Sequence, residues 1–128
     1  MSRATLLALA ARCEAAIGAD EGLRDDIAFA LGWRLRDAIW WKPPSGEWQM
    51  GLPDWLGALE ASFSLITKGM RVGALVKQPD YTIVNLCEVT TGIFYGNGTA
   101  ATFELALCAA ALRALALRPS AATMEDGE

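Results

Sequence analysis

The sequence predicts an α+β fold, in which a small antiparallel β-sheet of about three strands is covered by helices in an arrangement like an α-β-α sandwich. Apolar residues recur at helical spacing near both ends of the chain, whereas between Gly69 and Tyr95 they alternate with other residues, as in strands. Apolar residues make up 53% of the 128 residues, enough for one domain with its own core. A sheet this small has two faces to cover, so we expect helices on both sides of it.

The first two helices are predicted from composition and capping residues. Residues 5–17 are rich in Ala and Leu, which favour helix, and Gly18 ends this segment. Asp20 can cap a second helix that ends at Gly32, with its apolar residues on one stripe. The N-terminal stretch superficially resembles a signal peptide, but charges at Arg12 and Glu14 interrupt it, so we interpret it as the first helix.

The remaining elements follow the segment of residues 31–48. Asp54 is a candidate N-cap for a third helix reaching residue 66. Strands are predicted over residues 70–77 and 81–89, and residues 90–95 continue the second strand or form a third after a bend at Gly92. Thr99 can cap a last helix that runs to about Leu117. Residues 1–118 therefore form one globular domain, and residues 119–128 are an acidic tail that we expect to be disordered.

Three stretches resemble small phage-encoded proteins, including those grouped as the phage ABA sandwich domain. They are "ALGW" at residues 30–33, "LPDWLGALEASFSLI" at 52–66 and "TAATFELALCAAALRALA" at 99–116. The second is similar to that family's Tyr-Ser/Thr-x-x-x-x-Ala helix after a proline, although Asp54 and Trp55 stand where Tyr-Ser/Thr is expected. The resemblance implies the sandwich-like fold and a phage origin, and it transfers no catalytic residue.

The composition argues against several classes of function. The chain has no histidine, and its three cysteines, Cys13, Cys87 and Cys108, lie far apart among apolar residues. This removes the common nucleophile–histidine pairs and most zinc sites, so we predict no enzymatic activity, no cofactor and no metal. Buried free thiols indicate the reducing cytoplasm, here that of a bacterial host. A net charge of −4 argues against DNA binding, and no apolar run reaches the ~18 residues of a membrane span.

Residues 31–48, "LGWRLRDAIWWKPPSGEW", hold four of the five tryptophans, interleaved with basic residues. Such residues stack on flat aromatic ligands and offset phosphate charge. The candidate ligand-binding residues here are Trp33, Arg34, Arg36, Trp40, Trp41, Lys42 and Trp48. The alternatives are a Trp-rich corner of the core, or a protein interface anchored by aromatic and Arg side chains. Trp40 and Trp41 are adjacent in an extended stretch, so they should point to opposite sides.

A second candidate is "YGNGTAA", in which Gly96, Gly98 and Thr99 precede the last predicted helix. Its local pattern fits the GxGxxA dinucleotide fingerprint, but a Rossmann unit needs a further strand that this chain lacks. Free N–H groups at a helix N-terminus can still bind an anion such as phosphate. The alternative is an ordinary turn between strand and helix.

The last helix carries only Glu104 and Arg113 as charges, on opposite sides, and so has no broad polar face. Either other helices of the same chain bury it all round, or it forms a homo-oligomer interface. We predict a homo-oligomer and leave the first alternative open.

Three hypotheses for the function follow. The first is a non-enzymatic phage protein that binds and sequesters a nucleotide immune signal, a cyclic oligonucleotide, and so counters host antiviral defence. The second is a protein-binding module that inhibits a host enzyme or is a virion accessory, in which the Trp-rich segment forms a flat exposed patch. The third is a nucleotide-acting enzyme that uses carboxylates and a metal.

Overall fold

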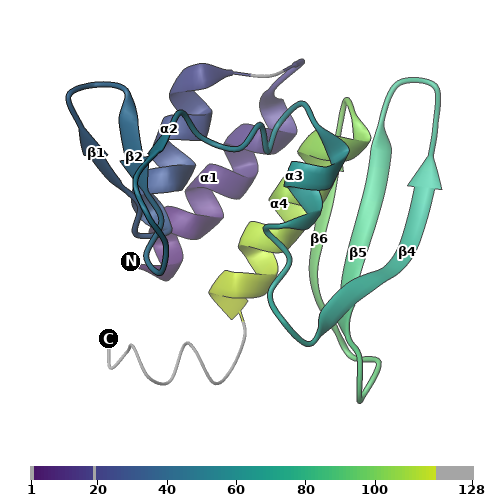
Figure 1. Cartoon of the computed structure of the whole chain (residues 1–128). Coiled ribbons are helices and arrows are strands. Elements are labelled where there is room, and N and C mark those ends of the chain that lie inside the picture. The colour runs from purple at the N-terminus through teal and green to yellow at the C-terminus, as the bar shows by residue number, and fades with distance from the viewer. Residues whose placement is uncertain (1, 19, 118–128) are drawn as a thin grey trace.

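The structure, a computed structural model, describes residues 2–18 and 20–117 (Figure 1). In chain order its elements are α1 (Arg3–Ala15), α2 (Glu21–Ala30), β1 (Arg34–Arg36), β2 (Trp40–Lys42), β3 (Gln49–Met50), α3 (Leu59–Phe63), β4 (Met70–Lys77), β5 (Thr82–Glu88), β6 (Phe94–Ala100) and α4 (Phe103–Leu117). The predicted α+β class with a three-stranded antiparallel sheet is confirmed. The predicted acidic tail, residues 119–128, lies outside the described residues.

The larger sheet has the strand order β4-β5-β6, with both pairs antiparallel. β4 and β5 are joined by a tight turn in which the Gln78 N–H donates to the Tyr81 carbonyl oxygen at 2.8 Å. The register of this pair shifts between Val72 and Ala74, which leaves Gly73 as the extra residue of a bulge.

The third strand and the start of the last helix differ from the prediction. β6 runs through the glycines of "YGNGTAA", which we expected to break the strand. The cap of α4 is Thr102 rather than Thr99, because the Leu105 N–H lies 3.1 Å from the Thr102 hydroxyl oxygen. Glycine stands at these strand positions because any larger side chain would collide with α4.

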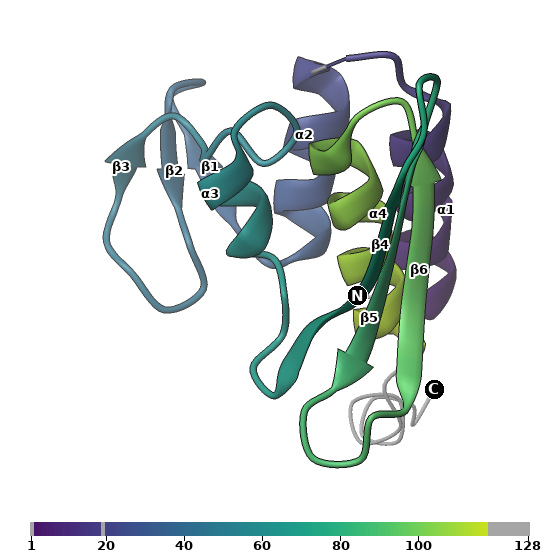
Figure 2. The ribbon, with the colours of Figure 1, turned by 90° about the vertical axis from the view of Figure 1, so that its right-hand side faces the viewer.

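Helix α4 lies at the centre of the fold, between α1 and the larger sheet (Figure 1), and in Figure 2 both helices lie behind that sheet. Ten of its residues are buried: Leu105, Ala106, Leu107, Cys108, Ala109, Ala110, Ala111, Leu112, Ala114 and Ala116. Burial within the same chain, the alternative left open above, therefore accounts for the missing polar face. The homo-oligomer stays a prediction, and its interface must be formed by a surface other than α4.

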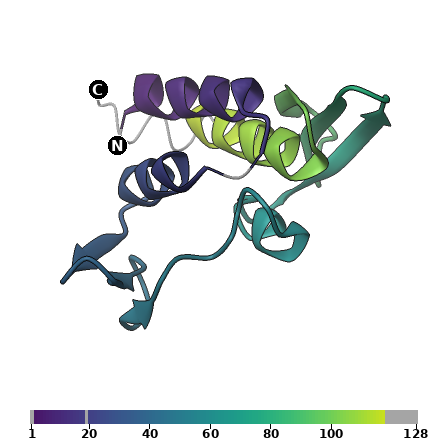
Figure 3. The ribbon, with the colours of Figure 1, turned by 90° about the horizontal axis from the view of Figure 1, so that it is seen from above.

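The helices cover one face of the larger sheet, and helices on the second face, which we expected, are not found among the described residues. Val84 and Leu86 of β5 are buried on the face that meets α4. On the other face, Phe94 is 59% exposed and lies over Gly73 and Cys87. Helix α3 lies on the same side of the sheet as α4 (Figure 3).

The second helix begins after the predicted cap Asp20, whereas the first begins at Arg3, two residues before the predicted start. The Asp20 carboxylate accepts from the Leu23 N–H at 3.1 Å, and the Ser2 hydroxyl caps α1 through the Thr5 N–H. The third helix is shorter than expected and starts at Leu59, because residues 55–57 form a turn in which Trp55 is buried. No helix in the described part of the chain is long and apolar enough to cross a membrane.

Candidate functional site

The Trp-rich segment forms a second antiparallel sheet, β1-β2-β3, rather than an irregular stretch. In its register Arg34 faces Lys42, Leu35 faces Trp41 and Arg36 faces Trp40. Residues opposite each other in an antiparallel pair share one face of the sheet, and successive residues alternate between faces. One face therefore carries Arg34, Arg36, Trp40 and Lys42.

Trp48 joins this face through Arg36. The Arg36 guanidinium carbon lies 4.4 Å from the centre of the Trp48 ring, a cation–π contact. We call Arg34, Arg36, Trp40, Lys42 and Trp48 the cationic tryptophan face. Sequence reasoning placed all five at a ligand site, and the structure brings these five together.

Two of the three cations on this face have no carboxylate partner in the part of the chain that the structure describes. Arg34 and Lys42 are directly opposite each other, and among the described residues neither takes part in a salt bridge. Arg36 has only Asp37, with 4.0 Å between nitrogen and oxygen and both side chains exposed. Like charges directly opposite each other destabilise a sheet, so this pair costs stability unless an anion lies between its members.

The turn between β1 and β2 is strained. Asp37 and Ala38 have φ values of 54° and 64°, in the left-handed region that L-residues other than Gly, Asn and Asp avoid. Asp tolerates this region, whereas the Cβ of Ala38 comes too close to the following carbonyl oxygen. This turn joins β1 to β2 in the register that places Arg36 opposite Trp40.

Two of the predicted ligand residues pack against the core. Trp41 is 5% exposed, and its ring centre lies 5.2 Å from that of Phe29 in α2. This burial corrects the expectation that Trp41 contacts a ligand. Trp33 is half-buried and packs edge-on against Trp55, with 5.7 Å between ring centres, and its contact with a ligand stays a prediction.

Gly96, Gly98 and Thr99 lie in strand β6 and not at a helix N-terminus, which corrects the predicted turn. A Cβ on Gly98 would collide with the Ala106 carbonyl oxygen, and one on Gly96 would lie 2.6 Å from the Ala114 nitrogen. These glycines therefore serve close packing of α4 on the strand. They belong to the larger sheet, apart from the cationic tryptophan face.

A carboxylate already occupies the neighbourhood of Thr99. The Thr99 N–H donates to Glu14 at 2.9 Å, and Arg113 donates to both Glu14 oxygens at 2.5 and 2.8 Å. These Arg113 hydrogen bonds hold the pKa of the Glu14 carboxyl below its ordinary value. Partial burial acts in the opposite direction and raises this pKa, and the hydrogen bond from the Thr99 N–H lowers it further. The arrangement ties α1, β6 and α4 together, and Glu14 already occupies the Thr99 N–H that an external anion would need.

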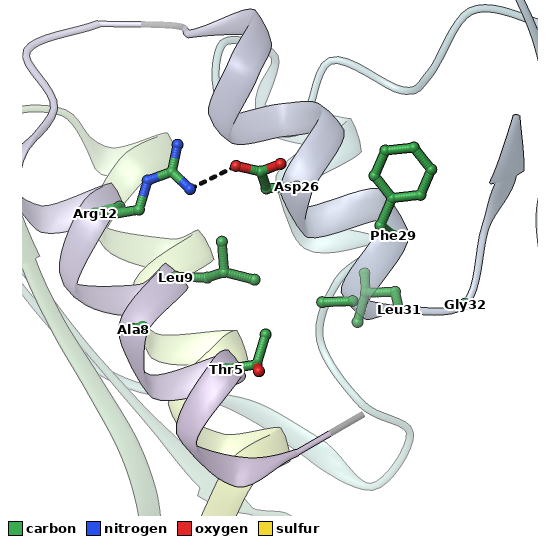
Figure 4. A pocket seen from close by; sticks show the side chains of 9 residues that line it. Thr5, Ala8, Leu9, Arg12, Asp26, Phe29, Leu31 and Gly32 are labelled. Atoms are coloured by element: carbon green, nitrogen blue, oxygen red, sulfur yellow. Dashed lines mark hydrogen bonds and ion pairs between the residues drawn. The ribbon is translucent and has the colours of Figure 1, made fainter.

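A groove between α1 and α2, of about 660 Å³, was not anticipated from the sequence (Figure 4). Its walls are mostly apolar, and the Arg12–Asp26 ion pair, 2.6 Å apart, spans it at one end. The lining residues are Thr5, Ala8, Leu9, Arg12, Asp26, Phe29, Ala30, Leu31 and Gly32. The spacing of Thr5, Ala8, Leu9 and Arg12 on one helix face was a signal that could have shown it.

The buried thiols have little nucleophilic character. All three cysteines are buried and free. Desolvation raises the pKa of Cys13 to about 12 and also raises the pKa of Cys108, whose thiol donates to the Trp55 carbonyl oxygen at 3.0 Å. Because the thiolate is the reactive form, such groups stay inert at neutral pH. Within residues 2–18 and 20–117, no group of three or more acidic or cysteine side chains could hold a metal ion.

Comparisons of the chain with models of protein families, with curated proteins and with solved structures find no match. The resemblance to the phage ABA sandwich domain therefore stays a prediction that depends on the three stretches quoted above.

Proposed function

We propose that the protein is a non-enzymatic binding protein whose cationic tryptophan face holds a phosphate-bearing nucleotide. The observation that carries the proposal is the Arg34–Lys42 pair, two cations held opposite each other without a carboxylate partner in the described residues. In a chain of net charge −4, such a pair is a local exception. A bound phosphate removes the repulsion and gains charge-assisted hydrogen bonds.

The aromatic residues of the face supply the second half of the recognition. Trp40 is half-buried and precedes Lys42 by two positions on the same side of β2. A nucleobase stacked on its ring gains ~1–3 kcal/mol, while the phosphate reaches the cations beside it. Arg36 already covers one side of the Trp48 ring, so Trp40 is the better stacking platform.

The biological setting in the proposal comes from the sequence resemblance. Some small phage proteins counter host defence in the bacterial cytoplasm by binding a nucleotide signal without destroying it. We therefore propose that the ligand is a cyclic nucleotide immune signal, and that its sequestration counters host antiviral defence.

A second candidate, a protein-binding module, is favoured by the open shape of the segment. None of the three cavities formed by α1 and α2, by α3 with β4, or beside Asp20 and Asp54 is lined by the cationic tryptophan face. Exposed apolar side chains surround it, with Met50 70% and Ile39 51% exposed. Aromatic and Arg anchors in such a setting suit an acidic partner protein as well.

The test is incubation of the purified protein with a panel of cyclic di- and trinucleotides, followed by removal of free ligand. The protein is then heated, and the released material is analysed by chromatography. Intact ligand supports the proposal, and altered ligand replaces it with an enzyme. Retention of no panel member favours the protein-binding module.

A matched pair of variants assigns any retained ligand to the face. Arg34→Ala with Lys42→Ala should abolish retention, while Arg71→Ala, which removes an exposed cation on the larger sheet, should preserve it. Equal retention by both variants would place the ligand elsewhere, for example in the groove of Figure 4.

A further inference from the structure

Strand β4 is the outer strand of the larger sheet, and no other element of the described chain lies beyond it (Figure 1). The Gln78 N–H points toward β5, where it donates to Tyr81. Hydrogen-bonding direction alternates along a strand, so the backbone groups of Lys77 and Leu75 point away from β5 toward the free edge. These groups are ready to pair with another strand.

The side chains at this end of β4 are apolar and exposed. Leu75 is 51% exposed and Val76 is 43% exposed, on opposite faces of the sheet. Beside Leu75 lies a groove of about 570 Å³ whose walls include Phe63 and Phe103. The rings of Phe63 and Phe103 meet edge-on, 6.1 Å apart, and leave this apolar surface open.

We propose that β4 pairs antiparallel with β4 of a second copy of this chain, about a two-fold axis at Val76, to form a six-stranded sheet across two subunits. Each Leu75 then faces Lys77 of the partner subunit, and the free backbone groups of both residues are satisfied. Val76 faces Val76 of the partner subunit on the uncovered side of the sheet.

The edge fits a second copy because the pairing is self-complementary. Leu75 and Lys77 lie symmetrically about Val76, and the bulge at Gly73 limits regular pairing to the strand beyond it. An axis at Ala74 would place Arg71 opposite Lys77 of the partner subunit, two like charges, so the axis at Val76 is favoured.

The apolar groove gains a cover in this arrangement. Lys77 of the partner subunit stands opposite Leu75 on the side of the sheet that carries the groove. Its methylene stem can lie over Phe63 and Phe103 while the ammonium group stays in water or over a ring. The cationic tryptophan face is on the far side of each subunit from β4, so the pairing leaves both faces open (Figure 1).

The first test is a disulfide at the axis. Opposed residues of a non-hydrogen-bonded antiparallel pair have Cα atoms about 4.5 Å apart, within the range for a disulfide. Val76→Cys should therefore form a covalent dimer under mild oxidation, seen on a non-reducing gel. The native cysteines are buried, so they do not compete. The control is Val89→Cys, a valine outside β4 that is 55% exposed, and it should give no covalent dimer on the same gel. Equal cross-linking of the two variants, or none, overturns the proposal.

The second test is sedimentation of the otherwise unmodified chain at micromolar concentration. We expect a dimer for the wild type and a complete loss of the dimer for Val76→Lys, which brings two cations together at the axis. The circular dichroism spectrum of Val76→Lys should match that of the wild type, since the side chain is exposed in the single chain, and this shows that the variant is folded. Its melting temperature should be lower only by the stabilisation that the dimer gives to the wild type. A wild type that is monomeric throughout overturns the pairing and leaves nucleotide binding unaffected, because the two surfaces are separate.

Discussion

Trp40 and Trp41 are neighbours in the sequence and have different environments in the structure. Trp41 is buried against Phe29, whereas Trp40 is half-buried on the face that carries the cations. The alternation of side chains along β2 produces this difference, as the extended stretch predicted. One tryptophan therefore fixes the small sheet to the core, and the other is available to a ligand.

The two tryptophans should respond differently to truncation. Trp41→Ala should lower the free energy of unfolding by ~3–5 kcal/mol, the cost of removing a core aromatic side chain. Trp40→Ala should cost about 1 kcal/mol or less, as for most surface changes. Urea unfolding followed by circular dichroism measures both. Equal losses would show that Trp40 is also a structural residue.

Ala38 offers a test of strain in the β1–β2 turn. Its φ of 64° costs an alanine roughly 1–2 kcal/mol that glycine does not pay. Ala38→Gly should therefore raise the free energy of unfolding by about 0.5–1 kcal/mol, after the larger entropy loss of glycine is subtracted. Ala8→Gly in α1, the control, should lower it by about 1 kcal/mol. A loss of stability for Ala38→Gly would mean that the turn differs from the one described.

At the scale of elements, the contact between β6 and α4 depends on glycine. Gly98→Ala should destabilise the protein by ~1–3 kcal/mol, since the new methyl group meets the backbone of α4 at Ala106. Gly18→Ala, where a methyl group meets nothing within 4 Å, is the matched control and should be nearly neutral. Thermal unfolding compares the two. If Gly98→Ala is also neutral, the strand and helix are further apart than the structure has them.

Glu14 links three elements, and its contribution should depend on pH. Because the folded state lowers its pKa, the stabilisation is full above the unfolded pKa, about 4.3, and is lost as the pH falls through the folded value. Glu14→Gln should therefore be less stable than the wild type at pH 7, and the difference should shrink on acidification. Denaturant unfolding at pH 7 and pH 3 measures it, and a difference independent of pH would contradict the role of the charge.

Helices and strands with a clear period could be predicted from the sequence, and segments governed by tertiary contacts could not. The alternation in β4 and the cap Asp20 depend on neighbouring residues, so these elements could be predicted. The cap Ser2 acts through the Thr5 N–H in the same local way. The glycines of β6 look like breakers until α4 is in place against them. The third helix was predicted too long, because we took Trp55 as part of its buried face. Trp55 is buried, but it lies in a turn that precedes the helix.

The candidate site was predictable in composition and not in geometry. Interleaved basic and aromatic residues marked residues 33–48 as unusual. Which of them share a face depends on the register of a hairpin whose turn, at Asp37 and Ala38, has no glycine to reveal it. The groove between α1 and α2 depends on how two helices pack, which a one-helix pattern does not fix.

At the scale of the whole molecule, the two proposed binding surfaces are far apart. The cationic tryptophan face lies at one end, and the free edge of β4 lies at the other (Figure 1). Between them, α4 is buried on all sides and joins both ends into one core. A ligand at one end and a second copy at the other can therefore bind independently.

The central claim is that the Arg34–Lys42 pair holds a phosphate-bearing nucleotide. Its most direct measurement is calorimetric titration of the cyclic di- and trinucleotide panel into the wild type, Arg34→Ala with Lys42→Ala, and Arg71→Ala. Loss of two charge-assisted hydrogen bonds should weaken binding of the double variant by roughly 3–6 kcal/mol. Its melting temperature should stay the same or rise, since a repulsion is removed. Arg71→Ala should bind like the wild type. The account is contradicted if no panel member binds the wild type, or if the double variant binds as tightly.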